Sequence, residues 1–436
     1  MTDIPKEYAA TPSNPAADPL EPESFLRRLG PGLVTGAADD DPGGIATYSQ
    51  VGAQFGFGMT WTMVFSYPFN AIIQEIAARI GCVTGAGTAQ NLRRHYSPWL
   101  LRWVVLMLIV ANVINLGADL GAMGAALVLL IGGPEPLYAL MFGVICIVLE
   151  VFMSYEKYAA VLKWMTLSLF AYVAVVFAVH LPWGTALAAT LLPTFVFDSA
   201  HATALVAILG TTISPYLFFW QAGQEVEEQH RRHTKALCIS PREAGAAFSR
   251  IRLDTLVGMG ISNLVAIFII YATAATLNAK GITEIETSAQ AAEALRPIAG
   301  ELSFLLFAAG IIGTGMLAVP VPVLAGSAAY AVGELFGWPQ GLNRLPREAK
   351  AFYGTIAAAT LAGVALNFID LDPIKALYWS AVVNGVLAAP LMAIMMLIAR
   401  NPRVMGRLTL SRSMMIGGWL ATLIMAAASI TFFLSL

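Results

Sequence analysis

Charged residues are scarce in this chain of 436 residues, at 12% of the total, whereas 58% of the residues are hydrophobic. A soluble domain has about a quarter of its residues charged and about half of them apolar, so this composition excludes an ordinary soluble protein and predicts a membrane protein. The formal net charge is −2, so the chain also lacks the basic excess that attracts nucleic acid. We therefore expect no nucleic-acid partner.

Cysteines are few, and a secretion signal is lacking. The three cysteines are widely spaced and form no Cys-x-x-Cys motif, which indicates neither a disulfide framework nor a zinc site. The first 24 residues are polar and proline-rich and contain no hydrophobic signal region. We expect residues 1–24 to form a disordered cytoplasmic tail and residues 25–436 to form one transmembrane domain. Nothing in the sequence indicates a cofactor or an obligatory protein partner.

Long apolar runs, by contrast, are abundant. A helix that spans the lipid bilayer needs about 20 mostly apolar residues. Windows of this kind occur at residues 30–54, 59–80, 99–131, 136–153, 158–181, 196–224, 252–277, 301–333, 351–369, 374–398 and 413–434. The sequence therefore predicts an all-α polytopic protein with eleven spans.

The distribution of lysine and arginine predicts the orientation of these spans. With the N-terminus inside, the inner loops and helix ends hold 22 of the 25 basic residues, and the outer side holds only Lys280, Arg296 and Lys375. Basic residues favour cytoplasmic loops, so we expect this orientation, and the odd number of spans then places the C-terminus outside. We expect the protein to reside in a bacterial inner membrane.

Two of the predicted spans carry helix-breaking sequences near their middle. Span one contains TGAADDDPGGI (residues 35–45), which places three carboxylates beside a Pro-Gly-Gly run. Span six contains LGTTISPY (residues 209–216), in which a proline is flanked by small polar residues. Acidic side chains at that depth are costly and are usually functional. A pair of simple proline kinks is the alternative interpretation.

The two breaks lie five spans apart, and this spacing has a topological consequence. Because five is odd, a duplicated unit of five helices inserts with opposite polarity in its second copy, which predicts two inverted repeats at about residues 30–181 and 196–398, followed by an extra helix at about 413–434. Discontinuous helices at matching positions of such repeats mark the midplane substrate site of a transporter.

Motifs in spans one and two resemble those of the Nramp family of divalent metal transporters. Residues 30–32 read GPG, residues 41–44 read DPGG, and residues 74–85 read QEIAARIGCVTG. The likeness is sharpest over residues 30–85 and weaker in span six. The resemblance implies a leucine-transporter-like fold of ten core helices plus one, with a cation held between unwound spans one and six.

The departures from the family pattern are equally informative. Gly44 replaces the asparagine that follows Pro-Gly in the family, Ser214 replaces the methionine of its Met-Pro-His motif, and Tyr216 stands in place of the histidine. In span three, the acids thought to carry protons in the family align with Asn115 and Ala118, while Asp119 lies one residue further on.

These replacements change the expected ion preference. A sulfur ligand favours transition metals over Mg²⁺, and Ser214 removes it. A site of carboxylate, hydroxyl and backbone oxygens suits a hard ion that keeps several of its waters. The pattern resembles the Nramp-related magnesium transporters, a branch associated with uncoupled uptake of Mg²⁺ and Mn²⁺. We therefore predict transport of these ions, uncoupled from protons, by alternating access.

Asp41 is the leading candidate ligand because a carboxylate offsets the charge of a divalent ion at low dielectric. Successive helical residues point about 100° apart, so the three acids cannot all face one ion directly. The candidate metal-site residues are Asp39, Asp40, Asp41, Gly44, Thr211 and Ser214. Asn115, Asp119, Tyr216 and Asn384 are candidate pathway residues, although asparagines in membrane helices more often hydrogen-bond to a neighbouring helix.

Three alternatives remain open at this point. The first is a proton-coupled importer of Mn²⁺ and Fe²⁺ of the ordinary Nramp type. The second is a sodium-coupled carrier of an organic solute, which the extra acids beside the break make a poor fit. The third is an intramembrane aspartyl protease, which would need its two acids on facing helices, whereas here they are adjacent on one segment. We therefore expect no enzymatic activity.

Overall fold

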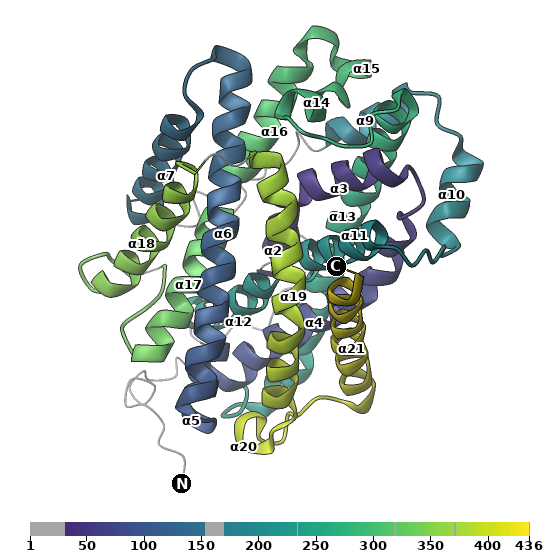
Figure 1. Cartoon of the computed structure of the whole chain (residues 1–436). Helices are drawn as coiled ribbons and strands as arrows, with labels where there is room; N and C mark the ends of the chain where they lie inside the picture. Colours follow the sequence, from purple (N-terminus) through teal and green to yellow (C-terminus); the bar gives the residue numbers. More distant parts are fainter. Residues whose placement is uncertain are drawn as a thin grey trace.

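The computed structural model describes residues 31–152, 170–232, 234–317, 320–342, 344–369 and 372–435. Every regular element within these ranges is a helix (Figure 1). The predicted tail at 1–24, Gly30 and the first part of predicted span five lie outside the described residues. The predicted division into a tail and two repeats with the boundaries given above stays a prediction.

Spans one and six are each broken into two helices. Span one consists of α2 (Pro31–Asp39) and α3 (Pro42–Phe55), and span six consists of α11 (Ser199–Thr212) and α12 (Pro215–Arg231). The second helix of each pair begins with a proline, which has no backbone N–H to donate and is favoured in the first helical turn. Both predicted interruptions are thus present at the predicted prolines.

The remaining helices fall near the predicted windows. Those that lie mainly within the predicted windows are α4 (Trp61–Thr84), α6 (Pro98–Ile131), α7 (Glu135–Phe152), α9 (Phe170–Ala178), α13 (Ala244–Thr276), α16 (Ser303–Leu317), α17 (Pro320–Phe336), α18 (Lys350–Leu366), α19 (Pro373–Arg400) and α21 (Arg412–Ser435). The short ones are α5 (Thr88–His95), α10 (Trp183–Leu191), η3 (Pro241–Glu243), η4 (Asn278–Lys280), α14 (Ser288–Glu293), α15 (Arg296–Ala299), η5 (Gly300–Leu302) and α20 (Pro402–Met405).

The window at 301–333 was predicted as a single span, and the structure describes it as two helices. Helix α16 ends at Leu317 and α17 begins at Pro320. In the described part of the chain, six helical segments are long and apolar enough to cross a membrane, including the pair α11–α12.

The broken spans pack in the centre of the bundle. Helix α6 runs almost the whole height of the molecule, and α19 lies beside it and extends from the middle to the lower end. Helices α7 and α18 form one flank, and α21 lies on the other side (Figure 1). Helix α2 packs closely on α13, and α11 packs on α19. A Cβ atom at Gly36 would lie 2.3 Å from the carbonyl oxygen of Gly258, so this glycine lets the backbones of α2 and α13 touch.

The outward-facing surface of the bundle carries large apolar side chains, as expected for helices in contact with lipid. Exposed examples are Trp99, Trp103, Leu187, Leu305, Ile416, Leu423 and Phe433. A surface of this kind would be an aggregation hazard in water but matches the hydrocarbon interior of a bilayer. The polar side chains described next are, in contrast, buried within the bundle.

Candidate metal site at the two helix breaks

Asp41 joins the break in span one to the break in span six. It is the N-cap of α3: the Gly44 amide donates to its Oδ1 at 2.6 Å. The Tyr216 hydroxyl, in the first turn of α12, donates to its Oδ2 at 2.9 Å. The side chain is only 1% exposed. The two interruptions therefore meet at one buried carboxylate, and Tyr216, predicted to line the pathway, contacts it directly.

Asp39 and Asp40 turn toward a different helix. The Ser262 hydroxyl of α13 lies 2.7 Å from Oδ2 of Asp39 and 3.2 Å from Oδ1 of Asp40. Both aspartates are buried, and Oδ1 of Asp39 has no hydrogen-bond partner. The described residues contain no group of three or more His, Cys, Asp or Glu side chains that could hold a metal ion together. The three acids of span one thus divide between α12 and α13.

Gly44 lies close to the end of α2 in its own broken span and to the Thr211 side chain of the other broken span. A Cβ atom at Gly44 would lie 2.8 Å from the carbonyl oxygen of Asp39 and 3.5 Å from the Thr211 hydroxyl. A side chain at position 44 would therefore collide with the last carbonyl of α2 in this conformation. An asparagine at this position, as in the Nramp motif, would not fit here unless the neighbouring atoms moved.

Ser214 lies between α11 and α12 and is completely buried. Its hydroxyl lies 2.7 Å from the Gly210 carbonyl and 2.8 Å from the Thr211 carbonyl, so its hydrogen is donated within its own span. This is the back-bonding that serine commonly makes in membrane helices. Because the hydrogen is used within the span, the oxygen lone pairs of Ser214 remain available to coordinate a metal ion.

Asn112, Asn115 and Asp119 follow one another at spacings of three and four residues and so form a polar stripe on α6, and the two asparagines contact two other helices. The Asn112 amide donates to the Ser327 hydroxyl of α17 at 2.7 Å, and the Ser380 hydroxyl of α19 donates to Oδ1 of Asn115 at 2.7 Å. The interhelical hydrogen bonds expected for these asparagines are confirmed.

Asp119 on α6 differs from these asparagines: it is completely buried, and neither of its oxygens has a hydrogen-bond partner. Asn384 on α19 is also buried, and its Oδ1 has no partner.

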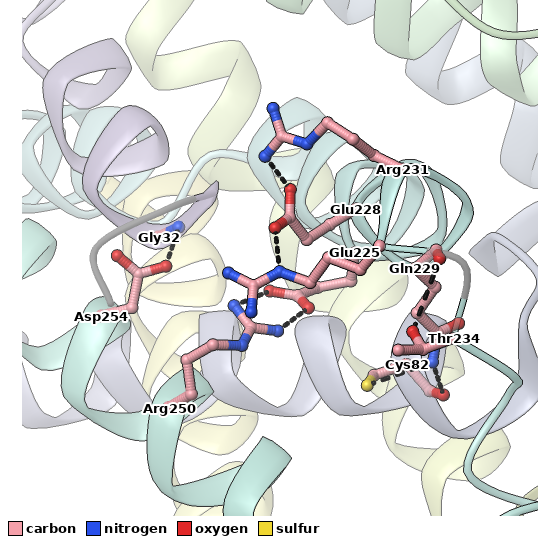
Figure 2. Close-up of polar contacts among 10 residues, drawn as sticks. Gly32, Cys82, Glu225, Glu228, Gln229, Arg231, Thr234, Arg250 and Asp254 are labelled. Atoms are coloured by element: carbon pink, nitrogen blue, oxygen red, sulfur yellow. Dashed lines mark hydrogen bonds and ion pairs between the residues drawn. The ribbon is translucent and has the colours of Figure 1, made fainter. Parts of the chain in front are cut away.

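A second cluster of charged groups, which the sequence did not reveal, lies at the end of the bundle predicted to be cytoplasmic (Figure 2). Arg250 of α13 pairs with Glu225 of α12 at 2.5 Å, and the Glu225 side chain is 0% exposed. One turn further along α13, Asp254 accepts the Gly32 amide of α2 at 2.7 Å. Arg231 and Arg232 both pair with Glu228 (Figure 2).

Glu225 and Glu228 belong to an acidic run at the end of α12, and such a run is typical of a solvated helix end, but both side chains are buried. Their basic partners hold them in the interior, where a lone carboxylate would be costly. The i, i+4 spacing of Arg250 and Asp254 on α13 was the only sequence signal for such a network. The sequence contains nothing that specifies which helix faces them.

His201 has a carboxylate partner three residues earlier in the chain. Asp198 is the N-cap of α11 and accepts both the backbone amide and the ring Nδ1 of His201, at 2.8 and 2.9 Å. These hydrogen bonds hold the pKa of the Asp198 carboxyl below its ordinary value. The pair is exposed and lies at the start of α11, away from the helix breaks.

Paired broken helices around a buried polar centre define a membrane transporter with a leucine-transporter-like fold. Solved structures of this architecture superimpose on the chain. A manganese transporter from Eremococcus coleocola, in complex with an aromatic bis-isothiourea compound, matches with a TM-score of 0.70 at 16% identity, covering 95% of this chain and 88% of that one. Mhp1, a nucleobase-cation-symport-1 family transporter, matches with a TM-score of 0.58 at 16% identity, covering 92% of each chain.

The chain belongs to the Nramp family. The family model described as natural resistance-associated macrophage protein-like matches residues 32–435. A divalent metal cation transporter MntH from Verminephrobacter eiseniae is 28% identical over 379 residues, which cover 84% of this chain and 83% of that protein. The family predicted from residues 30–85 is thus confirmed over nearly the whole chain.

Proposed function

We propose that this protein carries divalent metal cations across the membrane by alternating access around a site between spans one and six. The observation that carries the proposal is the buried carboxylate of Asp41, which is shared between the two helix breaks. A charged acidic side chain near the middle of the membrane is unfavourable in free energy unless a cation balances its charge. Curated relatives named divalent metal cation transporters support the same function.

We propose Mg²⁺ and Mn²⁺ as the transported ions. The groups gathered at the breaks are carboxylate, hydroxyl and backbone oxygens from Asp41, Gly44, Thr211 and Ser214, with Asp39 and Asp40 nearby. Oxygen ligands suit hard ions, and Mg²⁺ in particular binds through one or two carboxylates while keeping several waters. The Eremococcus coleocola relative is named as a manganese transporter, which supports Mn²⁺ as a second ion.

Ser214→Met should shift the ion preference toward softer metals. The change supplies a thioether sulfur at the break in span six, and sulfur favours transition metals over Mg²⁺. We expect the ratio of Mn²⁺ to Mg²⁺ uptake by proteoliposomes to rise several-fold, measured as competing initial rates. Ser214→Leu is the matched control because it adds similar bulk without sulfur. An equal shift in the methionine and leucine variants would show that size, and not sulfur, sets the ratio.

We propose that transport is not coupled to protons and is driven by the membrane potential. We also propose that the N-terminus lies in the cytoplasm and the C-terminus outside. An inside-negative potential of 100 mV supplies about 4.6 kcal/mol for the entry of a divalent ion. This is enough for accumulation without a second ion. Tyr216 replaces the histidine of the family motif, and Asn115 and Ala118 replace the family's two acids in span three. The loss of these titratable groups supports the uncoupled mechanism.

A proton-coupled importer of Mn²⁺ and Fe²⁺ is the second candidate function. The observation in its favour is that four aspartates, at positions 39, 40, 41 and 119, are buried, which is more carboxylates than one divalent ion neutralises. Extra carboxylates of this kind can carry protons.

Proteoliposomes that contain a pH-sensitive dye distinguish the two candidates. For the uncoupled mechanism we expect uptake of Mg²⁺ and Mn²⁺ driven by a potassium-valinomycin potential, with no change in lumenal pH. Acidification of the lumen on metal addition would instead establish the proton-coupled importer. Failure to take up either metal under a potential of either sign would refute metal transport altogether.

A further inference from the structure

We infer that Asp119 supplies the second carboxylate of the metal site, so that a divalent cation is held between Asp41 at the start of α3 and Asp119 on α6. This inference rests on the proposed function and adds a ligand that the motif in span one does not contain. It also assigns a role to a helix that is neither of the two broken spans.

The first argument is the state of the Asp119 side chain. It is 0% exposed, and both of its oxygens are buried without a hydrogen-bond partner. Among the described acidic residues only Glu150 is also in this condition. A carboxylate left unsatisfied in the membrane interior is strongly unfavourable and indicates a missing partner. A metal ion is a partner of the right charge.

The second argument is where Asp119 lies. Helix α6 packs against α3, and Asp119 lies one helical turn beyond Asn115 on the face of α6 that meets the break in span one. The charge of Asp119 lies close enough to that of Asp41 to interact with it. The residue one helical turn earlier, Asn115, is fixed by Ser380 of α19 and would be 3.8 Å from a Cβ atom at Gly43. Helix α6 is thus held with its polar stripe against the break in span one.

The third argument is charge. A divalent cation at low dielectric needs about two negative charges nearby, and Asp41 supplies one. Asp39 and Asp40 face the Ser262 hydroxyl on α13, which already engages one oxygen of each. Asp119 approaches from α6 with both oxygens available. Two carboxylates from separate helices bind an ion in the manner expected of Mg²⁺ sites.

Isothermal titration of the purified full-length protein with MgCl₂ and MnCl₂ tests the inference. We expect Asp119→Asn, which removes the charge and keeps the shape, to weaken binding of both ions by at least about tenfold, because the number of charged ligands sets the affinity of oxygen sites. The electron paramagnetic resonance spectrum of bound Mn²⁺ should change as well. Glu150→Gln is the matched control, since it removes the charge of the other unpartnered acid.

Each outcome decides the matter. Binding by Asp119→Asn within twofold of the wild type, with an unchanged Mn²⁺ spectrum, overturns the assignment and leaves the proposed function standing. Absence of binding by the wild type and by Glu150→Gln overturns both. Should Asp119→Asn fail to fold, Asp119→Glu is used instead: it keeps the charge but moves it, so we expect an altered ratio of Mg²⁺ to Mn²⁺ affinity, and an unchanged ratio overturns the assignment.

Discussion

Asp41→Asn is expected to lower the initial rate of Mg²⁺ and Mn²⁺ uptake into proteoliposomes by at least about a hundredfold. Asparagine is as good an N-cap as aspartate, so its Oδ1 can still accept the Gly44 amide, while its Nδ2 amide can donate to the oxygen of the Tyr216 hydroxyl, which is both donor and acceptor. What is lost is a negative charge in a buried position. Loss of one charge from a buried pair costs about 3–5 kcal/mol, and each 1.4 kcal/mol corresponds to a factor of ten.

The control for this prediction is Asp372→Asn. Asp372 is the N-cap of α19 and accepts the Lys375 amide at 3.0 Å, so the same chemical change is made at a helix start away from the breaks. We expect this variant to transport at the wild-type rate. Uptake by Asp41→Asn above about one tenth of the wild-type rate would contradict Asp41 as a principal ligand.

Arg250→Ala is expected to give the largest loss of stability among single substitutions outside the helix breaks. Arg250 lies 2.5 Å from Glu225, whose side chain is 0% exposed, and its charge also interacts with that of Asp254. Removing the guanidinium leaves a buried carboxylate without its cation. Breaking a buried pair in this way costs about 3–5 kcal/mol. Thermal unfolding in detergent should therefore begin at a clearly lower temperature.

Arg231→Ala provides the comparison. Arg231 pairs with Glu228 on the same helix but is 49% exposed, and exposed pairs contribute about 0–1 kcal/mol. A double variant, Glu225→Leu with Arg250→Met, should recover most of the loss, because well-packed apolar side chains replace a buried ion pair with little or no cost. Equal melting temperatures for Arg250→Ala and Arg231→Ala would refute a structural role for the Glu225–Arg250 pair.

The helix breaks could be predicted because their cause is local. Proline at positions 42 and 215 removes a backbone donor, and Asp41 caps the helix that follows, so a few neighbouring residues determine each interruption. The family motif over residues 30–85 then indicated that the two breaks belong to one site. This reasoning required no knowledge of how distant helices pack.

The partners of the site could not be predicted, because they are set by packing between segments far apart in the sequence. The Asp39–Ser262 contact joins residues 223 positions apart, and the Asp41–Tyr216 contact joins residues 175 apart. Ser262 looked like one more small polar residue in an apolar span. Glu225 looked solvated because its partner, Arg250, is 25 residues away on the next long helix.

Cys82 gives this protein a built-in attachment point for a fluorescent maleimide. Its sulfur lies at the end of α4 and is 3.4 Å from the Gln229 amide nitrogen of α12, and the residue is 3% exposed (Figure 2). Cys146 is also buried, whereas Cys238 is exposed and can be replaced by serine. Any movement that parts α12 from α4 uncovers the Cys82 thiol, so the rate of dye labelling in a Cys238→Ser background follows that movement without an introduced cysteine.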